Sequence, residues 1–169
     1  MKIGIDARFF GPKDKGIGRY VENLIRNLEK IDPPAGGNQY FIFLKKERWD
    51  EYRPAKQNFR KILLRWPFPL LLAKYNPDLM HFTFYKVPIF YKNKFILTVH
   101  DLTWQRFSLF NPLKKLIYKT GFRLAIERAE KIIAVSGYVK EDIVKTYPAK
   151  NGASKISPDK IRVIYEGVT

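Results

Sequence analysis

Polar side chains that can do chemistry follow several apolar runs of the sequence. His100 and Asp101 come directly after the apolar run FILTV. A charged pair at the end of a buried strand is unusual in a core and typical of an active-site edge. An imidazole and a carboxylate can hold a reacting hydroxyl or move its proton. The alternative is a capped strand end, in which Asp101 holds His100 or starts a turn.

A second histidine, His81, follows the run PDLM in the same way. Its aromatic neighbours Phe82 and Phe84 make a packed, hydrogen-bonded histidine nearly as good an interpretation. The chain has 2 His and no Cys, so we expect no metal site. Ser136, in AVSGY, lacks the G-x-S-x-G pattern of a serine nucleophile and is interpreted as a helix cap.

The run Gly16-Ile17-Gly18 precedes an amphipathic pattern that predicts a helix up to residue 31. Free N–H groups at a helix N-terminus favour an anion, glycines let a phosphate approach, and Arg19 adds charge. The run is not a dinucleotide fingerprint, because position 21 is Val, and no Walker A sequence follows it. A flexible turn with two convenient glycines is the alternative.

Strands and helices alternate along the chain and must position these side chains. We expect strands at residues 2–7, 40–44, 62–64, 77–84, 95–100, 131–135 and 161–165. Further helices are expected at residues 111–129 and 136–146. This order predicts one Rossmann-like α/β domain over residues 1–169, with a mostly parallel sheet and helices on both faces. Ligands bind at the carboxyl ends of such strands, at Asp6 to Arg8, His81, His100 and Ser136.

Composition narrows the class of partner. The 169 residues hold 32 Lys and Arg against 16 Asp and Glu, so the net charge is +16. With 46% hydrophobic and 15% aromatic residues, a disordered chain is excluded. The sequence shows no signal peptide, and its longest apolar stretch is far shorter than the ~20 residues of a membrane span. The charge indicates a polyanionic partner.

The positive charge is concentrated in two segments rich in aromatic residues, 45–74 and 105–131. Cations mixed with apolar rings suit docking on anionic lipid headgroups. The residues predicted to face a membrane are Lys114, Lys115, Tyr118, Lys119, Phe122 and Arg123. Nucleic acid could use the same pairing, but no helix-turn-helix or RNP-like motif supports it. A merely solvated basic face is the remaining alternative.

Taken together, the loops resemble the amino-terminal half of GT-B glycosyltransferases, specifically the retaining GT4 group. The similarity runs in the family's order through IGIDARFF, GIGRYVENLIRNL, PDLMHF, LTVHDLTWQRF, AIERAEKIIAVSGYVKEDI and KIRVIYEGV. Each segment alone is weak, whereas the ordered series is specific. Residues 49–75 are the least similar part.

The resemblance implies roles for individual residues. His100, with Asp101, corresponds to the family's active-site position near the transferred sugar. The residues implied to border the donor diphosphate or the cleft are Gly16, Ile17, Gly18 and Ser136. The residues implied to face the acceptor are Asp6, Arg8, Arg19 and His81.

The resemblance also implies an enzyme that transfers a hexose from a nucleotide-diphosphate sugar to a lipid-linked or polysaccharide acceptor, with retention. Neither a cofactor nor a metal is expected. The family's donor-binding domain follows a hinge similar to VIYEGV, so we expect this chain to be the acceptor-side half and inactive alone. We expect it in the cytoplasm, at the inner membrane face, in polysaccharide biosynthesis. The alternative is a non-catalytic membrane-surface or acceptor-binding module, acting alone or with a separate donor-binding partner.

Overall fold

The computed structural model describes residues 1–33, 37–106, 111–148 and 156–167. The chain forms two compact units. The first comprises residues 1–83 and 90–94, and the second comprises residues 84–89 and 95–169. Within each unit, every strand pair in the described ranges is parallel. Parallel strands joined through helices make an α/β, Rossmann-like fold, as predicted.

The first unit has its strands in the spatial order β3-β2-β1-β4. Their bounds are β1 (Lys2–Ala7), β2 (Gln39–Leu44), β3 (Phe59–Leu63) and β4 (Leu79–Phe82). Its helices are α1 (Lys15–Ile31) and α2 (Phe68–Tyr75), with short 3-10 turns at Pro12–Asp14 and Lys46–Arg48. β1 lies inside this sheet, so the loop that follows it emerges between the ends of two neighbouring strands.

One face of this sheet packs against α1. Side chains alternate along β2, so Tyr40, Ile42 and Leu44 share a face and join the cluster that contains Val21 and Ile25 of α1. All five side chains are buried, at 3% exposed or less. The apolar period of α1 that the sequence shows is therefore its core-facing side.

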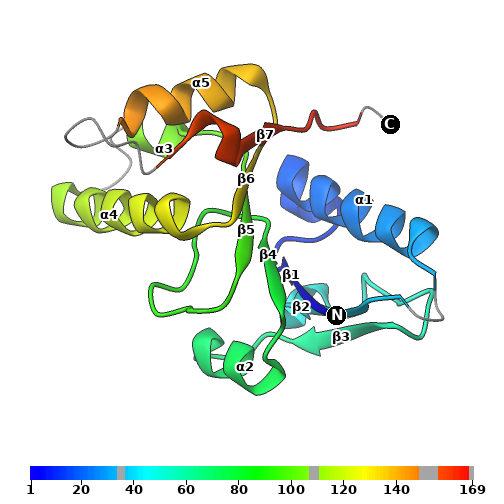
Figure 1. Ribbon diagram of the computed structural model, residues 1–169. Helices are drawn as coiled ribbons and strands as arrows, with labels where there is room; N and C mark the ends of the chain where they lie inside the picture. The colour runs from blue at the N-terminus through cyan, green and yellow to red at the C-terminus, as the bar shows by residue number, and fades with distance from the viewer. Residues whose placement is uncertain (34–36, 107–110, 149–155, 168–169) are drawn as a thin grey trace. The chain divides into compact units, whose positions relative to one another are not determined.

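The opposite face of the same sheet packs against α2. The ring of Phe43 lies 5.8 Å from that of Phe68 and 5.9 Å from that of Tyr75, both edge-on. α1 and α2 thus cover opposite faces of the first unit's sheet, as Figure 1 shows. Helices on both faces were predicted, and this unit confirms them.

The second unit has its strands in the order β5-β6-β7. Their bounds are β5 (Phe95–Val99), β6 (Lys131–Ala134) and β7 (Ile161–Val163). Its helices are α3 (Thr103–Arg106), α4 (Pro112–Arg128) and α5 (Gly137–Thr146), with a 3-10 turn at Pro158–Lys160. The side chain of Asn111 caps α4 by accepting from Lys114 N at 2.8 Å. These elements follow the predicted order, and the three strands share one carboxyl edge.

Three helices differ from the prediction: α1, α2 and the short α3, which was not predicted. α1 begins at Lys15, so the two glycines lie inside its first turn and not in a preceding loop. α2 was not predicted, because two prolines interrupt its apolar run. It forms because Pro67 is the N-cap residue and Pro69 lies in the first turn, where a helix needs no backbone donor.

Four strands are shorter than predicted: β4, β5, β6 and β7. In the described ranges, no helix is both long and apolar enough to cross a membrane.

Candidate functional site

In the first unit, Asp6 and Arg8 form a buried ion pair at the carboxyl end of β1. Asp6 is 0% exposed, and Arg8 Nε donates to both of its carboxylate oxygens at 2.9 Å. Arg8 also lies 5.3 Å from the centre of the Phe68 ring. Burial lowers the pKa of Arg8, but Asp6 outweighs it, so the pKa lies above its usual value. Asp6 therefore holds Arg8, and of the two only Arg8 is partly exposed.

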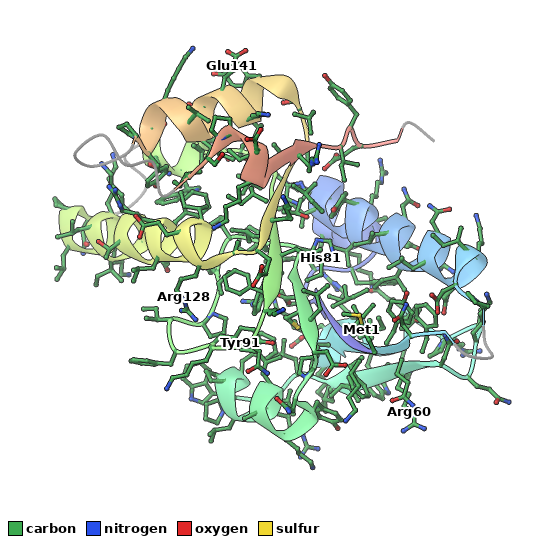
Figure 2. All side chains as sticks on the ribbon, in the orientation of Figure 1. Met1, Arg60, His81, Tyr91, Arg128 and Glu141 are labelled. Carbon is green, nitrogen blue, oxygen red and sulfur yellow. The ribbon has the colours of Figure 1, made fainter. Side chains whose placement is uncertain are left out.

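His81 is buried within β4, at 6% exposed, and pairs in register with Ile5 of β1. Figure 2 shows it on the strand itself rather than on a loop beyond it. The packed histidine that the sequence left open is the arrangement that the structure has. A role at the acceptor would require a surface that this side chain barely reaches.

The loop between β1 and α1 is closed by specific contacts. Gly11 N donates to the carbonyl of Gly18 at 3.0 Å, with Gly11 at a φ of 78° that favours glycine. A Cβ on Gly18 would lie 2.1 Å from the carbonyl oxygen of Gly11, so only glycine fits there. The interpretation as a flexible turn is therefore wrong for Gly18.

A partly buried ion pair anchors the same loop to the 3-10 turn after β2. Arg48 donates to both carboxylate oxygens of Asp14, at 2.6 and 2.9 Å. Asp14 also accepts from Phe10 N at 3.0 Å. The hydrogen bonds from Arg48 hold the pKa of Asp14 below its usual value, although partial burial opposes them. The sequence did not predict this ion pair, because 34 residues separate Asp14 from Arg48.

Gly16 differs from Gly18 in having no packing reason to be glycine. A Cβ there would meet nothing within 4 Å, and the residue is exposed in the first turn of α1. The N-cap residue Asp14 makes no side-chain capping bond to this turn, because its carboxylate is bound to Arg48. Arg19 is exposed on the same helix. The first turn of α1 thus offers uncapped donors beside a cation, which suits an anion.

In the second unit, His100 follows β5 and is held by a residue that the sequence did not single out. Its Nδ1 lies 2.9 Å from Oε1 of Glu166, and the two side chains are 13% and 41% exposed. Glu166 follows β7, two strands away in the sheet. The motif VIYEGV contains this glutamate, but only the strand order shows that it reaches His100.

Asp101 makes a local turn just before α3, and Ser136 is the N-cap residue of α5. Asp101 Oδ1 accepts from Thr103 N at 2.8 Å and so starts α3, with its side chain exposed. Ser136 Oγ accepts from Val139 N at 3.2 Å and caps α5, which confirms that prediction. The alternative in which Asp101 starts a turn is the one that the structure has, and the carboxylate bonded to His100 is that of Glu166.

The predicted membrane-facing residues of α4 do not all face solvent. Phe122 is 2% exposed and packs against Tyr147, so it belongs to the core. Tyr118 and Lys115 are half-buried, and Arg123 pairs with Glu127 at 2.9 Å. Lys114 and Lys119 are exposed, as predicted. In the first basic segment, residues 45–74, three of the aromatic side chains are buried in the core and do not face solvent: Tyr52, Phe59 and Phe68.

The exposed apolar residues of α4 are different ones. Leu113, Leu116, Ile117 and Leu124 are 67%, 61%, 56% and 37% exposed. At 100° per residue, Leu113, Ile117 and Leu124 share one face of the helix with Leu116 at its border, opposite Phe122. We call these four residues the α4 outer face. The sequence missed it because α4 is apolar on two sides, which removes the usual amphipathic contrast.

Solved structures are similar to this fold. A sucrose-phosphate synthase from Thermosynechococcus elongatus aligns over 99% of this chain and 90% of its own, with a TM-score of 0.58 and 16% identity. At that identity the likeness concerns the fold, which is that of a GT-B glycosyltransferase. No curated protein is similar enough in sequence to count as a relative.

The sequence itself defines the family. The profile of Glycosyltransferase Family 4 matches residues 15–169, nearly the whole chain. The chain therefore belongs to Glycosyltransferase Family 4, as its ordered loop motifs predicted. Enzymes of this kind take a nucleotide-sugar donor and an acceptor.

Proposed function

We propose that this chain is the acceptor-side domain of an enzyme that transfers a hexose from a nucleotide-diphosphate sugar to a lipid-linked or polysaccharide acceptor, with retention. The observation that carries the proposal is the family match over residues 15–169, which includes both the α1 N-terminus and the residue after β5. The proposed place of work is the cytoplasmic face of the membrane. The proposed reaction needs no metal or cofactor.

At the α1 N-terminus, the chemistry concerns the diphosphate. The exposed Gly16 leaves the first turn of α1 without a side chain, so a phosphate can approach its N–H groups. Gly18 keeps the preceding loop closed against the helix and so fixes those donors in place. Arg8, held by Asp6, and the exposed Arg19 supply positive charge on the same unit. Developing charge on the leaving diphosphate is neutralised mainly by basic groups of a donor-binding domain.

In the second unit, His100 is the group proposed to contact the sugar. It follows a buried strand at the carboxyl edge, where α/β sheets bind ligands, and it is partly exposed. Its proposed role is to hydrogen-bond the reacting sugar. Asp101 and Ser136 contribute by holding the first turns of α3 and α5.

The test combines this chain with a GT4 donor-binding domain, supplied as a fusion or as a separate protein. We expect the chain alone to be inactive and the combination to hydrolyse or transfer nucleotide sugar. His100→Ala should lower the rate strongly, by about 100-fold or more. Glu141→Gln, on the outer side of α5 in Figure 2, is the matched control and should leave it unchanged. An unchanged rate in His100→Ala would remove His100 from the mechanism.

The α4 outer face favours a second function, a membrane-surface module. Four large aliphatic side chains lie exposed on one helix, and the exposed Lys114 and Lys119 flank them. A helix with such a face can lie in the interface of a bilayer, with its cations at anionic headgroups. We propose that the α4 outer face rests on anionic lipid, which would bring a lipid-linked acceptor to the enzyme.

Liposome co-sedimentation tests this second function. Leu113→Ser with Ile117→Ser should lower binding to vesicles of phosphatidylglycerol and phosphatidylcholine by about tenfold. The matched control is Tyr138→Ser with Ile164→Ser, which removes two exposed apolar side chains, 63% and 53% exposed, elsewhere in the same unit. If both double variants lose vesicle binding equally, the binding is non-specific and not specific to the α4 outer face. Lipid binding without transfer in the combined protein would favour the non-catalytic module.

A further inference from the structure

The contact between His100 and Glu166 joins two segments that are far apart in the sequence. Nδ1 of His100 and Oε1 of Glu166 lie 2.9 Å apart across 66 residues. Glu166 follows β7, whereas His100 follows β5, and β6 lies between these strands. The chain after β7 continues along the end of β6, because Ile164 N donates to the carbonyl of Ala134 at 3.0 Å. That path carries Glu166 over the strand ends to the imidazole.

The chemistry of this contact is directional. A carboxylate only accepts hydrogen bonds, so the ring nitrogen that faces it must carry a proton. Nδ1 of His100 is therefore the protonated nitrogen, and in the neutral ring the acceptor lone pair lies on Nε2. A histidine so held has one tautomer and one ring orientation, as in other sites where a carboxylate bonds the far side of a functional imidazole.

The carboxylate of the neighbouring Asp101 is not the group that orients His100. Asp101 follows His100 directly, but its Oδ1 accepts from Thr103 N at 2.8 Å and its side chain faces solvent at the start of α3. The side chain of His100 is 13% exposed, so most of it is buried and a small part is accessible. This arrangement is that of an imidazole oriented by the carboxylate of Glu166.

We propose that Glu166 is a positioning residue for His100. It fixes the Nδ1–H tautomer and so makes Nε2 the atom that accepts a hydrogen bond from a hydroxyl of the bound sugar. This inference rests on the proposed function for the role of His100 toward sugar. The orientation itself rests only on the contact between the two side chains.

The test is NMR on the chain itself, because its 2 histidines give separate and easily assigned signals. Long-range proton–nitrogen correlation at a pH where the rings are neutral reports which nitrogen carries the proton. We expect the Nδ1–H tautomer for His100 in the natural sequence. In Glu166→Ala the population should shift at least tenfold toward Nε2–H, whereas Glu166→Gln should retain most Nδ1–H, because its amide oxygen still accepts.

Controls separate this effect from general disturbance. His81, buried in β4 of the other unit, should keep its tautomer in every variant. Glu141→Gln should leave both histidines unchanged. If His100 is already in the Nε2–H form in the natural sequence, or if Glu166→Ala leaves its tautomer unaltered, the proposal is wrong.

An activity measurement on the combined protein tests the functional half. At metal sites, removing a partner that orients a liganding side chain costs about 10–100-fold in metal affinity or activity. We expect that loss in kcat for Glu166→Ala, with partial rescue by Glu166→Gln and no further loss when Glu166→Ala is added to His100→Ala. Additive losses would overturn the coupling. If the combined protein transfers no sugar at all, the proposed function fails, and the tautomer result still decides the orientation.

Discussion

At the scale of single residues, two ion pairs of the first unit hold the loop after β1: the Asp6–Arg8 pair and the partly buried Asp14–Arg48 pair. Asp6 is fully buried beneath Arg8, and Asp14 binds Arg48 through both carboxylate oxygens. In the Asp6–Arg8 pair, removing one partner leaves the other charge poorly hydrated, which costs more than the intact pair contributes. These residues therefore hold the loop after β1 in one conformation, and their variants should report on stability first.

Asp6→Asn should lower the free energy of unfolding by about 3–5 kcal/mol, because it leaves the Arg8 guanidinium without its carboxylate. Urea denaturation measures this. Glu22→Gln is the control, since it breaks an exposed pair with Arg26 and should cost about 0.5 kcal/mol or less. Should Asp6→Asn fail to fold, Asp6→Leu with Arg8→Met removes both charges and should restore folding. A loss no larger than that of the control would show that the pair contributes little.

The Asp14–Arg48 pair predicts a pH dependence of stability. Arg48 lowers the pKa of Asp14 in the folded state, so the unfolded state binds the proton more tightly. The stabilisation is fully present above the unfolded-state pKa of about 3.9 and is lost as the pH falls through the lower folded-state pKa. Urea denaturation from pH 6 down to pH 2 should show a smaller acid loss in Asp14→Asn than in the natural sequence. If stability falls equally with pH in Asp14→Asn and in the natural sequence, Asp14 does not contribute the proposed pH dependence.

At the scale of elements, the first turn of α1 contains two glycines with different roles: packing requires Gly18 to be glycine but does not require it of Gly16. Gly18 is enclosed, and its absent Cβ makes room for the carbonyl of Gly11. Gly16 is exposed in the same turn and lies near no other atom that a Cβ would touch. A glycine in a helix costs stability relative to alanine, so a helix that keeps one without a packing reason is consistent with a ligand at that place.

Gly16→Ala and Gly18→Ala should therefore have opposite effects. Gly16→Ala should raise the free energy of unfolding by about 0.5–1 kcal/mol, because alanine loses less entropy in the helix. Gly18→Ala should lower it, since its Cβ would overlap a backbone oxygen. Thermal or urea denaturation measures both. In the combined protein, Gly16→Ala should slow transfer despite its greater stability, and an unchanged rate would exclude a close phosphate.

Local sequence patterns explain which helices and strands could be predicted. The strands and α1 follow from apolar periodicity, and the caps of α4 and α5 follow from Asn111 and Ser136. α2 could not be predicted, because prolines break the pattern except where they stand in a first turn. The α4 outer face was also missed, since apolar residues on two sides of a helix look alike until the fold buries one of them.

At the scale of the whole molecule, the proposed lipid-binding surface combines the net charge of +16 with the α4 outer face. The charge attracts any polyanion and falls off within a Debye length of about 10 Å at 0.1 M salt. Insertion of aliphatic side chains is much less sensitive to salt. A surface that combines positive charge with exposed aliphatic side chains should bind anionic lipid strongly at low salt. At high salt it should still bind, more weakly, through the aliphatic side chains.

Raising NaCl from 0.1 M to 1 M should therefore lower binding to anionic liposomes by about tenfold or more, because the Debye length shrinks to about 3 Å. The residual binding should disappear in Leu113→Ser with Ile117→Ser, which leaves the charge intact. Co-sedimentation measures both effects. Equal pelleting with neutral and anionic vesicles at low salt would count against the electrostatic part, and tighter, salt-sensitive binding to DNA or RNA would favour the nucleic-acid alternative.

The sequence by itself determined the family, the order of the elements and the polar residues at strand ends, because motifs and periodicity are local properties of the chain. Tertiary structure alone decided which of those residues are accessible. It buried Asp6, His81 and Phe122, and exposed the α4 outer face. It also brought Glu166 to His100 across 66 residues. Burial and long-range pairing depend on which strands become neighbours, and no local pattern of residues encodes that choice.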